Sequence, residues 1–263
     1  MDLDPAAVRS GVRLVSHDTI GSTNADAIQR ARAGERGPLW VTAQRQTAGR
    51  GRRGRVWVSE PGNLYASLLL TDPSPTDRGP ELSLLAALAV HDAVASATGA
   101  PGTRLTLKWP NDLLLDGAKL AGVLVEAETG SDGILAAVVG IGINCSFHPA
   151  DTAYAATDLA AAGLPVKPHD LFRALSGAMP KRLAEWNRGQ GFRASRAAWL
   201  ARATWIGSLV RVSRGDRETH GRFETLDDTG RLVLRSTDGG VEHITSGELR
   251  ILDAAAGAEA RGQ

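Results

Sequence analysis

Cysteine is nearly absent from this sequence of 263 residues, in which Cys145 stands alone. One cysteine excludes an intrachain disulfide framework and fits a reducing compartment such as the cytoplasm. The N-terminal residues Met1 to Pro5 are acidic and lack the pattern of a signal peptide. We find no apolar run that approaches the roughly 18 residues of a membrane span, and no internal repeat. We therefore expect a cytoplasmic globular protein with no membrane partner.

A marked excess of either charge sign is also missing. The formal net charge is +1, so no global field favours nucleic acid or a membrane surface. Hydrophobic residues make up 43% and charged residues 22%, which is ordinary for a globular protein. The length suits one large domain and a smaller one. Positive charge is therefore informative only where it is concentrated locally.

That concentration lies in residues 46–57. Arg50, Arg52, Arg53 and Arg55 alternate there with three glycines. Glycine allows positive φ and close approach of the backbone to a ligand, and guanidinium groups are charged forks that match phosphate geometry. The segment therefore predicts an anion-binding loop, and we expect the loop to be mobile until a ligand orders it.

Three other interpretations of this loop are open. The spacing Gly49-x-Gly51-x-x-Gly54 matches the dinucleotide fingerprint by letter, but that fingerprint needs a helix to begin at the third glycine. Val56 to Val58 instead predicts a strand. The loop could also be a basic arm on nucleic acid or a solvated surface loop.

A second polar segment consists of Ser22, Thr23 and Asn24. All three are good N-cap residues for the helix predicted over 25–33, which should end at Gly34. Helix capping alone explains one of them. Three small polar side chains in a row could also bind a neutral polar ligand.

The chain from Leu105 to Asp112 predicts a strand that ends at a Pro-Asn-Asp turn. It is either a hairpin turn with an aromatic plug, or a site that places Lys108 and Asp112 at the mouth of a sheet. Lys119 begins the apolar strand over 120–126. It is either a surface lysine or a positive charge fixed on a rigid element.

The remaining periodicity predicts a mixture of strands and helices in the first 205 residues. Strands are predicted at 12–15, 38–46, 63–70, 105–109, 120–126 and 133–144, and helices at 4–10, 25–33, 80–98, 168–186 and 193–202. The alternation from Leu64 to Leu70 predicts a strand with one buried face. Pro180 should kink or split its helix. Beyond Ile206, short strands at 208–212, 221–226, 232–234 and 241–245 predict a small β-barrel.

Five segments in this order resemble the biotin protein ligases. They are Gly21–Asn24, Gln46 with Gly49–Arg55, Lys108–Asp112, Lys119–Gly122 and Gly140–Asn144. The resemblance implies an α+β fold. In this fold a catalytic domain over 1–205 would consist of a mixed sheet packed with helices, as in class II synthetases and biotin–lipoate ligases. It also implies an SH3-like barrel over 206–253, and we expect a disordered tail over 254–263. We expect no N-terminal DNA-binding domain, because few residues precede Ser22.

The resemblance implies an ATP-dependent biotin–[acetyl-CoA-carboxylase] ligase. Such an enzyme makes biotinyl-5′-adenylate from biotin and MgATP and passes biotin to a lysine of a carboxyl carrier domain. ATP, Mg²⁺ and biotin are then substrates, with no prosthetic group and no metal site in the protein. No DNA partner is implied, and we expect a monomer or a weak homodimer. A lipoate–protein ligase and a nucleic-acid-binding protein are the alternatives.

The resemblance also implies the site residues. The residues implied for biotin are Ser22, Thr23, Asn24, Gln46, Arg50, Gly51, Arg52 and Lys119. Those implied for the nucleotide are Arg52, Arg55, Trp57, Asn111, Lys119 and Asn144, and those implied for catalysis are Lys119, Arg52 and Asp112. The chemistry agrees, since a buried ureido ring needs neutral donors and acceptors. Joining a carboxylate to a phosphate also needs cations positioned beforehand.

Overall fold

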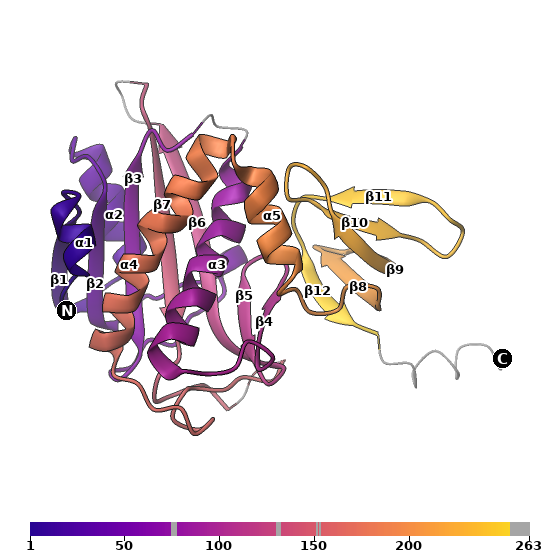
Figure 1. Ribbon diagram of the computed structural model, residues 1–263, viewed down its shortest axis with the longest axis horizontal. Helices are drawn as coiled ribbons and strands as arrows, with labels where there is room; N and C mark the ends of the chain where they lie inside the picture. The colour runs from indigo at the N-terminus through magenta and orange to yellow at the C-terminus, as the bar shows by residue number, and fades with distance from the viewer. Residues whose placement is uncertain (75–77, 130–132, 151, 153, 253–263) are drawn as a thin grey trace.

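The computed structural model describes residues 1–74, 78–129, 133–150, 152 and 154–252. In these residues the chain forms two β-sheets, with helices packed on the larger one (Figure 1). The predicted α+β class is confirmed. The tail expected to be disordered, 254–263, lies outside the described residues.

The larger sheet has seven strands in the order β1-β2-β3-β7-β6-β5-β4. Its strands are β1 (Arg13–Ile20), β2 (Leu39–Gln46), β3 (Leu64–Thr71), β4 (Leu105–Lys108), β5 (Asp112–Leu115), β6 (Ala118–Thr129) and β7 (Leu135–Ile143). Only β1 and β2 pair in parallel, and the other neighbours are antiparallel. The sheet is therefore mixed, as predicted, and its long central strands β3, β7 and β6 give the site a rigid floor.

The helices cover the two faces of this sheet unequally. They are α1 (Pro5–Arg9), α2 (Thr23–Arg32), α3 (Gly79–Thr98), α4 (Pro168–Trp186) and α5 (Phe192–Leu200), with 3₁₀ turns at Arg52–Gly54 and Asn187–Gly189. In Figure 1, α3, α4 and α5 lie in front of the sheet and α2 lies behind it. A small apolar cluster of Ala27, Leu39, Val41 and Leu69 joins α2 to the rear face. The main core lies on the other face.

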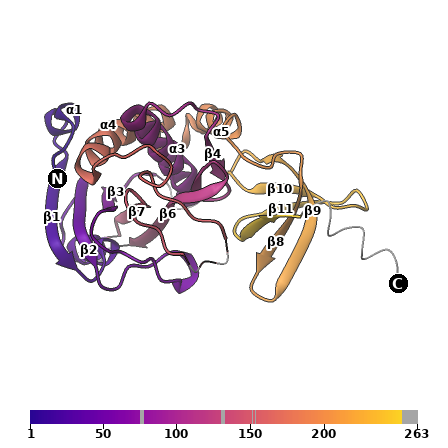
Figure 2. The ribbon, with the colours of Figure 1, turned by 90° about the horizontal axis from the view of Figure 1, so that it is seen from below.

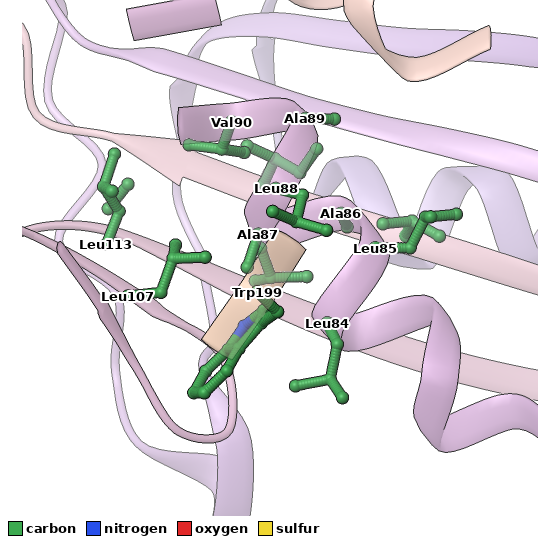
Figure 3. Close-up of a cluster of buried hydrophobic side chains, with 14 of the residues drawn as sticks. Leu84, Leu85, Ala86, Ala87, Leu88, Ala89, Val90, Leu107, Leu113 and Trp199 are labelled. Carbon is green, nitrogen blue, oxygen red and sulfur yellow. The ribbon is translucent and has the colours of Figure 1, made fainter. Parts of the chain in front are cut away.

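Helix α3 is the centre of that main core. Its leucines and alanines are buried on almost every side, against β4, β5 and the indole of Trp199 from α5 (Figure 3). By length and composition α3 is apolar enough to cross a membrane, although most of it is buried inside the protein. Our expectation that no segment reaches that length was therefore wrong. A helix enclosed by protein on all sides has the same composition as a membrane span.

The smaller sheet follows α5 and lies beside β4 and β5 (Figure 2). Its strands are β8 (Leu209–Arg214), β9 (Arg217–Leu226), β10 (Leu232–Arg235), β11 (Val241–Ile244) and β12 (Glu248–Ile251). They are all antiparallel, in the order β11-β10-β9-β8-β12, as expected of a small SH3-like barrel. The indole N–H of Trp109 donates to the carbonyl of Gly230 at 3.3 Å, so the predicted aromatic plug joins the two sheets.

Two local predictions differ from the structure. Pro180 does not split α4, which runs unbroken from Pro168 to Trp186 because its packing on α3 outweighs the missing N–H. Val56 to Val58 forms one isolated bridge rather than a strand, with Val56 82% exposed. The hairpin turn predicted at the Pro-Asn-Asp segment joins the antiparallel strands β4 and β5 over residues 109–111, and Asp112 is the first residue of β5.

Candidate active site

One cavity gathers nearly all of the predicted site residues. Its walls come from the start of α2, the arginine loop (residues 49–57), the β4–β5 turn, the middle of β6 and β7, and β12. The residues that line it are Ser22, Thr23, Asn24, Gln46, Arg50–Arg53, Arg55–Trp57, Lys108–Asp112, Lys119, Gly122–Leu124, Gly140–Gly142, Tyr154 and Gly247–Leu249. Of the predicted residues, only Asn144 is outside this set. Its amide donates to the carbonyl of Thr157 at 3.0 Å.

The first wall of the cavity is polar and uncharged. Ser22 caps α2, as one of the two interpretations predicted, and its hydroxyl accepts from Ala25 N at 3.4 Å. Thr23 donates to Oε1 of Gln46 from both its backbone N–H, at 2.8 Å, and its hydroxyl, at 3.1 Å. Gln46 Nε2 in turn donates to Ser59 Oγ at 3.0 Å. These groups are held in fixed orientations, which suits a neutral polar ligand.

Two glycines of β7 form the floor beneath this wall. A Cβ at Gly140 would lie 2.1 Å from Oδ1 of Asn24, and one at Gly142 would lie 2.6 Å from the ring of Trp57. At both glycines the group that approaches the strand closely is a side chain. The strand therefore needs glycine at both positions so that Asn24 and the arginine loop can lie on it.

The opposite wall carries fixed positive charge. Nζ of Lys119 lies 2.7 Å from Oδ1 of Asp112, and Nζ of Lys108 lies 3.8 Å from Oδ2 of the same carboxylate. Lys119 also lies 5.4 Å from the ring centroid of Trp57 and 5.2 Å from that of Tyr154. Its side chain is 17% exposed, so the surface-lysine interpretation of Lys119 was wrong.

One interpretation of the sequence placed Lys108 at the mouth of the sheet, but assigned it no role toward a substrate. Burial lowers its pKa, with the charge of Asp112 opposing this shift and that of Lys119 adding to it. Two amines and one carboxylate thus share a largely desolvated corner of the cavity. The register of β4, β5 and β6 sets this cluster, because Lys108 pairs with Asp112 and Asp112 pairs with Gly122.

The arginine loop lies across the cavity between β6 and the smaller sheet. On the β6 side, Arg50 Nη2 lies 2.9 Å from Oε1 of Glu126. On the other side, the loop contacts the smaller sheet through Arg52 to the Gly247 carbonyl at 3.4 Å, Arg53 to the Ser213 carbonyl at 3.2 Å, and Arg55 to Glu248 at 2.8 Å. Arg52 also donates to Oδ1 of Asn111 at 3.2 Å. After the 3₁₀ turn the chain is extended, so no helix begins at Gly54 and the dinucleotide interpretation is wrong.

The two carboxylates that line the cavity are both paired with cations. Asp112 is shared by the two lysines. Burial by itself would raise the pKa of Glu248. The hydrogen bond to Arg250 and the charge of Arg55 outweigh this effect and hold the pKa below its usual value. In the described ranges, no group of three His, Cys, Asp or Glu side chains could hold a metal ion.

Comparisons with known proteins agree with this geometry. Residues 20–144 match the biotin/lipoate A/B protein ligase family, and residues 206–249 match the biotin protein ligase C-terminal domain. The fold, the cavity and these matches place the chain in the class of biotin and lipoate protein ligases.

Individual relatives narrow this class. The biotin–[acetyl-CoA-carboxylase] ligase of Paracoccus denitrificans is 41% identical over 224 residues, which cover 83% of this chain and 92% of the relative. The enzyme of the same name from Mycobacterium tuberculosis is 36% identical over 222 residues, which cover 81% of this chain and 80% of that enzyme. The biotin protein ligase of Aquifex aeolicus, solved with biotin and ATP, superimposes with a TM-score of 0.76 at 27% identity, covering 91% and 99%. The chain belongs to the biotin protein ligase family.

Proposed function

We propose that this ATP-dependent ligase activates biotin with MgATP and transfers it to a lysine of a biotin carboxyl carrier domain. One observation carries the proposal. A single cavity joins a fixed, neutral polar wall at Thr23 and Gln46 to a buried cluster of two lysines, with the arginine loop across it. A molecule with a neutral polar head and a carboxylate tail fits these two ends.

The first step joins two anions. A carboxylate oxygen of biotin attacks the α-phosphorus of ATP, and the bond from that phosphorus to the β-phosphate oxygen breaks and releases pyrophosphate. Lys119 and Arg52 would stabilise the negative charge that gathers on the α-phosphate. Mg²⁺, arriving with ATP, would neutralise phosphate charge. The indole N–H of Trp57 is buried and without a hydrogen-bond partner in the described part of the chain, so an acceptor on the nucleotide would satisfy it.

The second step transfers the acyl group. The neutral amine of the acceptor lysine attacks the carbonyl carbon of the adenylate, the bond from that carbon to the phosphate oxygen breaks, and AMP leaves while the amine loses a proton. Asp112 would orient that amine or accept its proton. Because its carboxylate also holds Lys108 and Lys119, its first role is to fix these two side chains.

The site roles are part of this proposal. Ser22, Thr23, Asn24 and Gln46 would bind the head of biotin, Arg50, Gly51 and Arg52 would contact the body and carboxylate, and Arg55, Trp57 and Asn111 would contact the nucleotide. Asn144 would act on the nucleotide side by holding the segment at Thr157 in place. We further propose that the protein acts in the cytoplasm, as a monomer or weak homodimer, with no DNA partner.

The test is ATP–pyrophosphate exchange with biotin and lipoate in parallel. We expect exchange that depends on biotin, followed by biotin transfer to a purified carrier domain. Exchange with lipoate alone would identify a lipoate ligase instead. DNA binding that weakens with salt, without any exchange, would support the nucleic-acid alternative.

A further inference from the structure

Glu126 of β6 lies behind the polar wall and was not among the predicted site residues. It does not line the cavity, but it contacts two residues that do. Its Oε2 accepts from Nδ2 of Asn24 at 2.8 Å, and its Oε1 accepts from Nη2 of Arg50 at 2.9 Å. We propose that Glu126 is a positioning residue that holds Asn24 and Arg50 in the geometry that binds biotin. This inference rests on the proposed function.

The contact with Asn24 fixes the orientation of its amide. A carboxylate only accepts hydrogen bonds, so the NH₂ group of Asn24 must face Glu126. On the other side of the amide, Oδ1 of Asn24 accepts a hydrogen bond from the hydroxyl of Ser67 at 2.5 Å. The missing Cβ of Gly140 leaves room for the amide between them. Asn24 is 4% exposed, and its amide is set from both sides before any ligand arrives.

The contact with Arg50 fixes the start of the arginine loop. Arg50 forms an isolated bridge with Val56, and Gly51 N donates to the carbonyl of Arg55 at 2.8 Å, so these residues close the neck of the loop. The Arg50 guanidinium reaches over β6 to Glu126. One carboxylate thus holds both the wall predicted for biotin and the neck of the loop that covers it.

The polar contacts continue from Asn24 to the far end of the same loop. Ser67 Oγ lies 2.8 Å from Oγ1 of Thr23, the backbone N–H of Thr23 donates to Gln46, and Gln46 donates to Ser59. The hydroxyl of Ser59 donates to the carbonyl of Trp57 at 2.8 Å. A continuous series of hydrogen bonds therefore runs from Glu126 through the polar wall to the end of the loop. Loss of the charge at Glu126 should act first on the two groups that it contacts itself, the amide of Asn24 and the guanidinium of Arg50.

Glu126→Gln is the decisive variant, because a glutamine has the same size but cannot accept at both positions. One of its ends carries an NH₂ group that would face a donor of Asn24 or Arg50. We expect the KM for biotin to rise roughly 10-fold or more, as for a lost charged hydrogen bond. The KM for ATP and the melting temperature should stay close to wild type. Glu126→Asp should give an intermediate KM.

Glu128→Gln is the matched control. Glu128 lies two residues further along β6 and forms a surface pair with Arg32 at 2.6 Å. The Glu128→Gln variant therefore removes one negative charge from the same strand without changing a contact of the polar wall. We expect its KM for biotin to equal that of the wild type. In the double variant Asn24→Ala/Glu126→Gln, the two effects should add less than fully, because Glu126 acts in part through Asn24.

Each outcome has a distinct meaning. An unchanged KM for biotin in Glu126→Gln overturns the inference while leaving the proposed function intact. A parallel rise of both KM values with a lower melting temperature also overturns it, because that pattern indicates a general structural role. Absence of biotin-dependent exchange in the wild-type protein overturns the proposed function itself.

Discussion

The carboxylate of Asp112 lies 2.7 Å from Nζ of Lys119 and 3.8 Å from Nζ of Lys108, so one acid holds two amines in a single corner of the cavity. These residues come from the end of β4, the start of β5 and the start of β6. Two adjacent turns bring them together. This arrangement fixes positive charge on rigid elements, which is what a reaction between two anions requires.

The first prediction concerns Lys119. In Lys119→Ala, biotin-dependent pyrophosphate exchange should fall by roughly 10²-fold or more, because a fixed charge at the reacting phosphate is lost. Lys181→Ala, at an exposed position on α4, should exchange like the wild type. Full exchange by Lys119→Ala would exclude Lys119 from the adenylation step.

Asp112→Asn should slow the transfer of biotin from preformed adenylate to the carrier by about 10-fold or more. The amide keeps the shape of the side chain but neither pairs with the lysines nor accepts a proton. Single-turnover transfer measures this step alone. Asp116→Asn, at the exposed turn where Asp116 pairs with Arg104 at 2.6 Å, is the control. Transfer at the wild-type rate would remove Asp112 from this step.

Substitutions at the two glycines of β7 should raise the KM of different substrates. In Gly140→Ala the new methyl group collides with Asn24, so the KM for biotin should rise, whereas in Gly142→Ala it collides with Trp57, so the KM for ATP should rise. Overpacking of roughly 1–3 kcal/mol corresponds to about 5- to 150-fold. Gly79→Ala, with no atom near the added carbon, should change neither value. Equal effects of both substitutions on both substrates would contradict this assignment.

The pair of Arg55 and Glu248 should retain the adenylate. In Glu248→Gln the loop loses one contact with the smaller sheet. When biotin and ATP are supplied without an acceptor protein, AMP should therefore appear in solution faster than with the wild type. The pair is partly exposed, so the effect should be modest, at most about 5-fold for roughly 0.2–1 kcal/mol. A rate of AMP release equal to that of the wild type in Glu248→Gln would show that this pair does not help to retain the adenylate.

Ligands should protect the arginine loop from trypsin. Ordering its residues costs roughly 1–2 kcal/mol each, so we expect the free loop to open often and be cut after its arginines. Biotin and ATP together should slow this cleavage, while cleavage after the exposed Arg9 in α1 should not change. Equal resistance with and without ligands would show that the loop is already ordered.

Much of the site could be predicted because its motifs are local. The arginine loop, the Lys-Trp-Pro-Asn-Asp segment and Lys119 each carry unusual chemistry in a few consecutive residues, and all of them line one cavity. The helices α3 and α4 were also predicted closely, since a helical period over about 20 residues is a strong signal. The limit of such patterns shows at α3, where we wrongly expected no segment long and apolar enough to cross a membrane.

Residues that join the motifs could not be found in this way. Ser67 lies on β3, where the alternation of apolar residues predicted one buried face, but the whole run from Leu64 to Leu70 is buried. Its other face carries the hydroxyl that contacts Thr23 and Asn24. Glu126 likewise resembles any exposed acid near the end of a strand.

By itself, the sequence determined which chemical groups are present and which short segments hold them, because propensity, periodicity and motif spacing are properties of neighbouring residues. Only the tertiary structure decided that Gly247 to Leu249 complete the cavity, that the arginine loop lies between β6 and the smaller sheet, and that Glu126 supports the polar wall. These relations join residues about 76 to 195 positions apart, which meet through strand pairing and the packing of the two sheets.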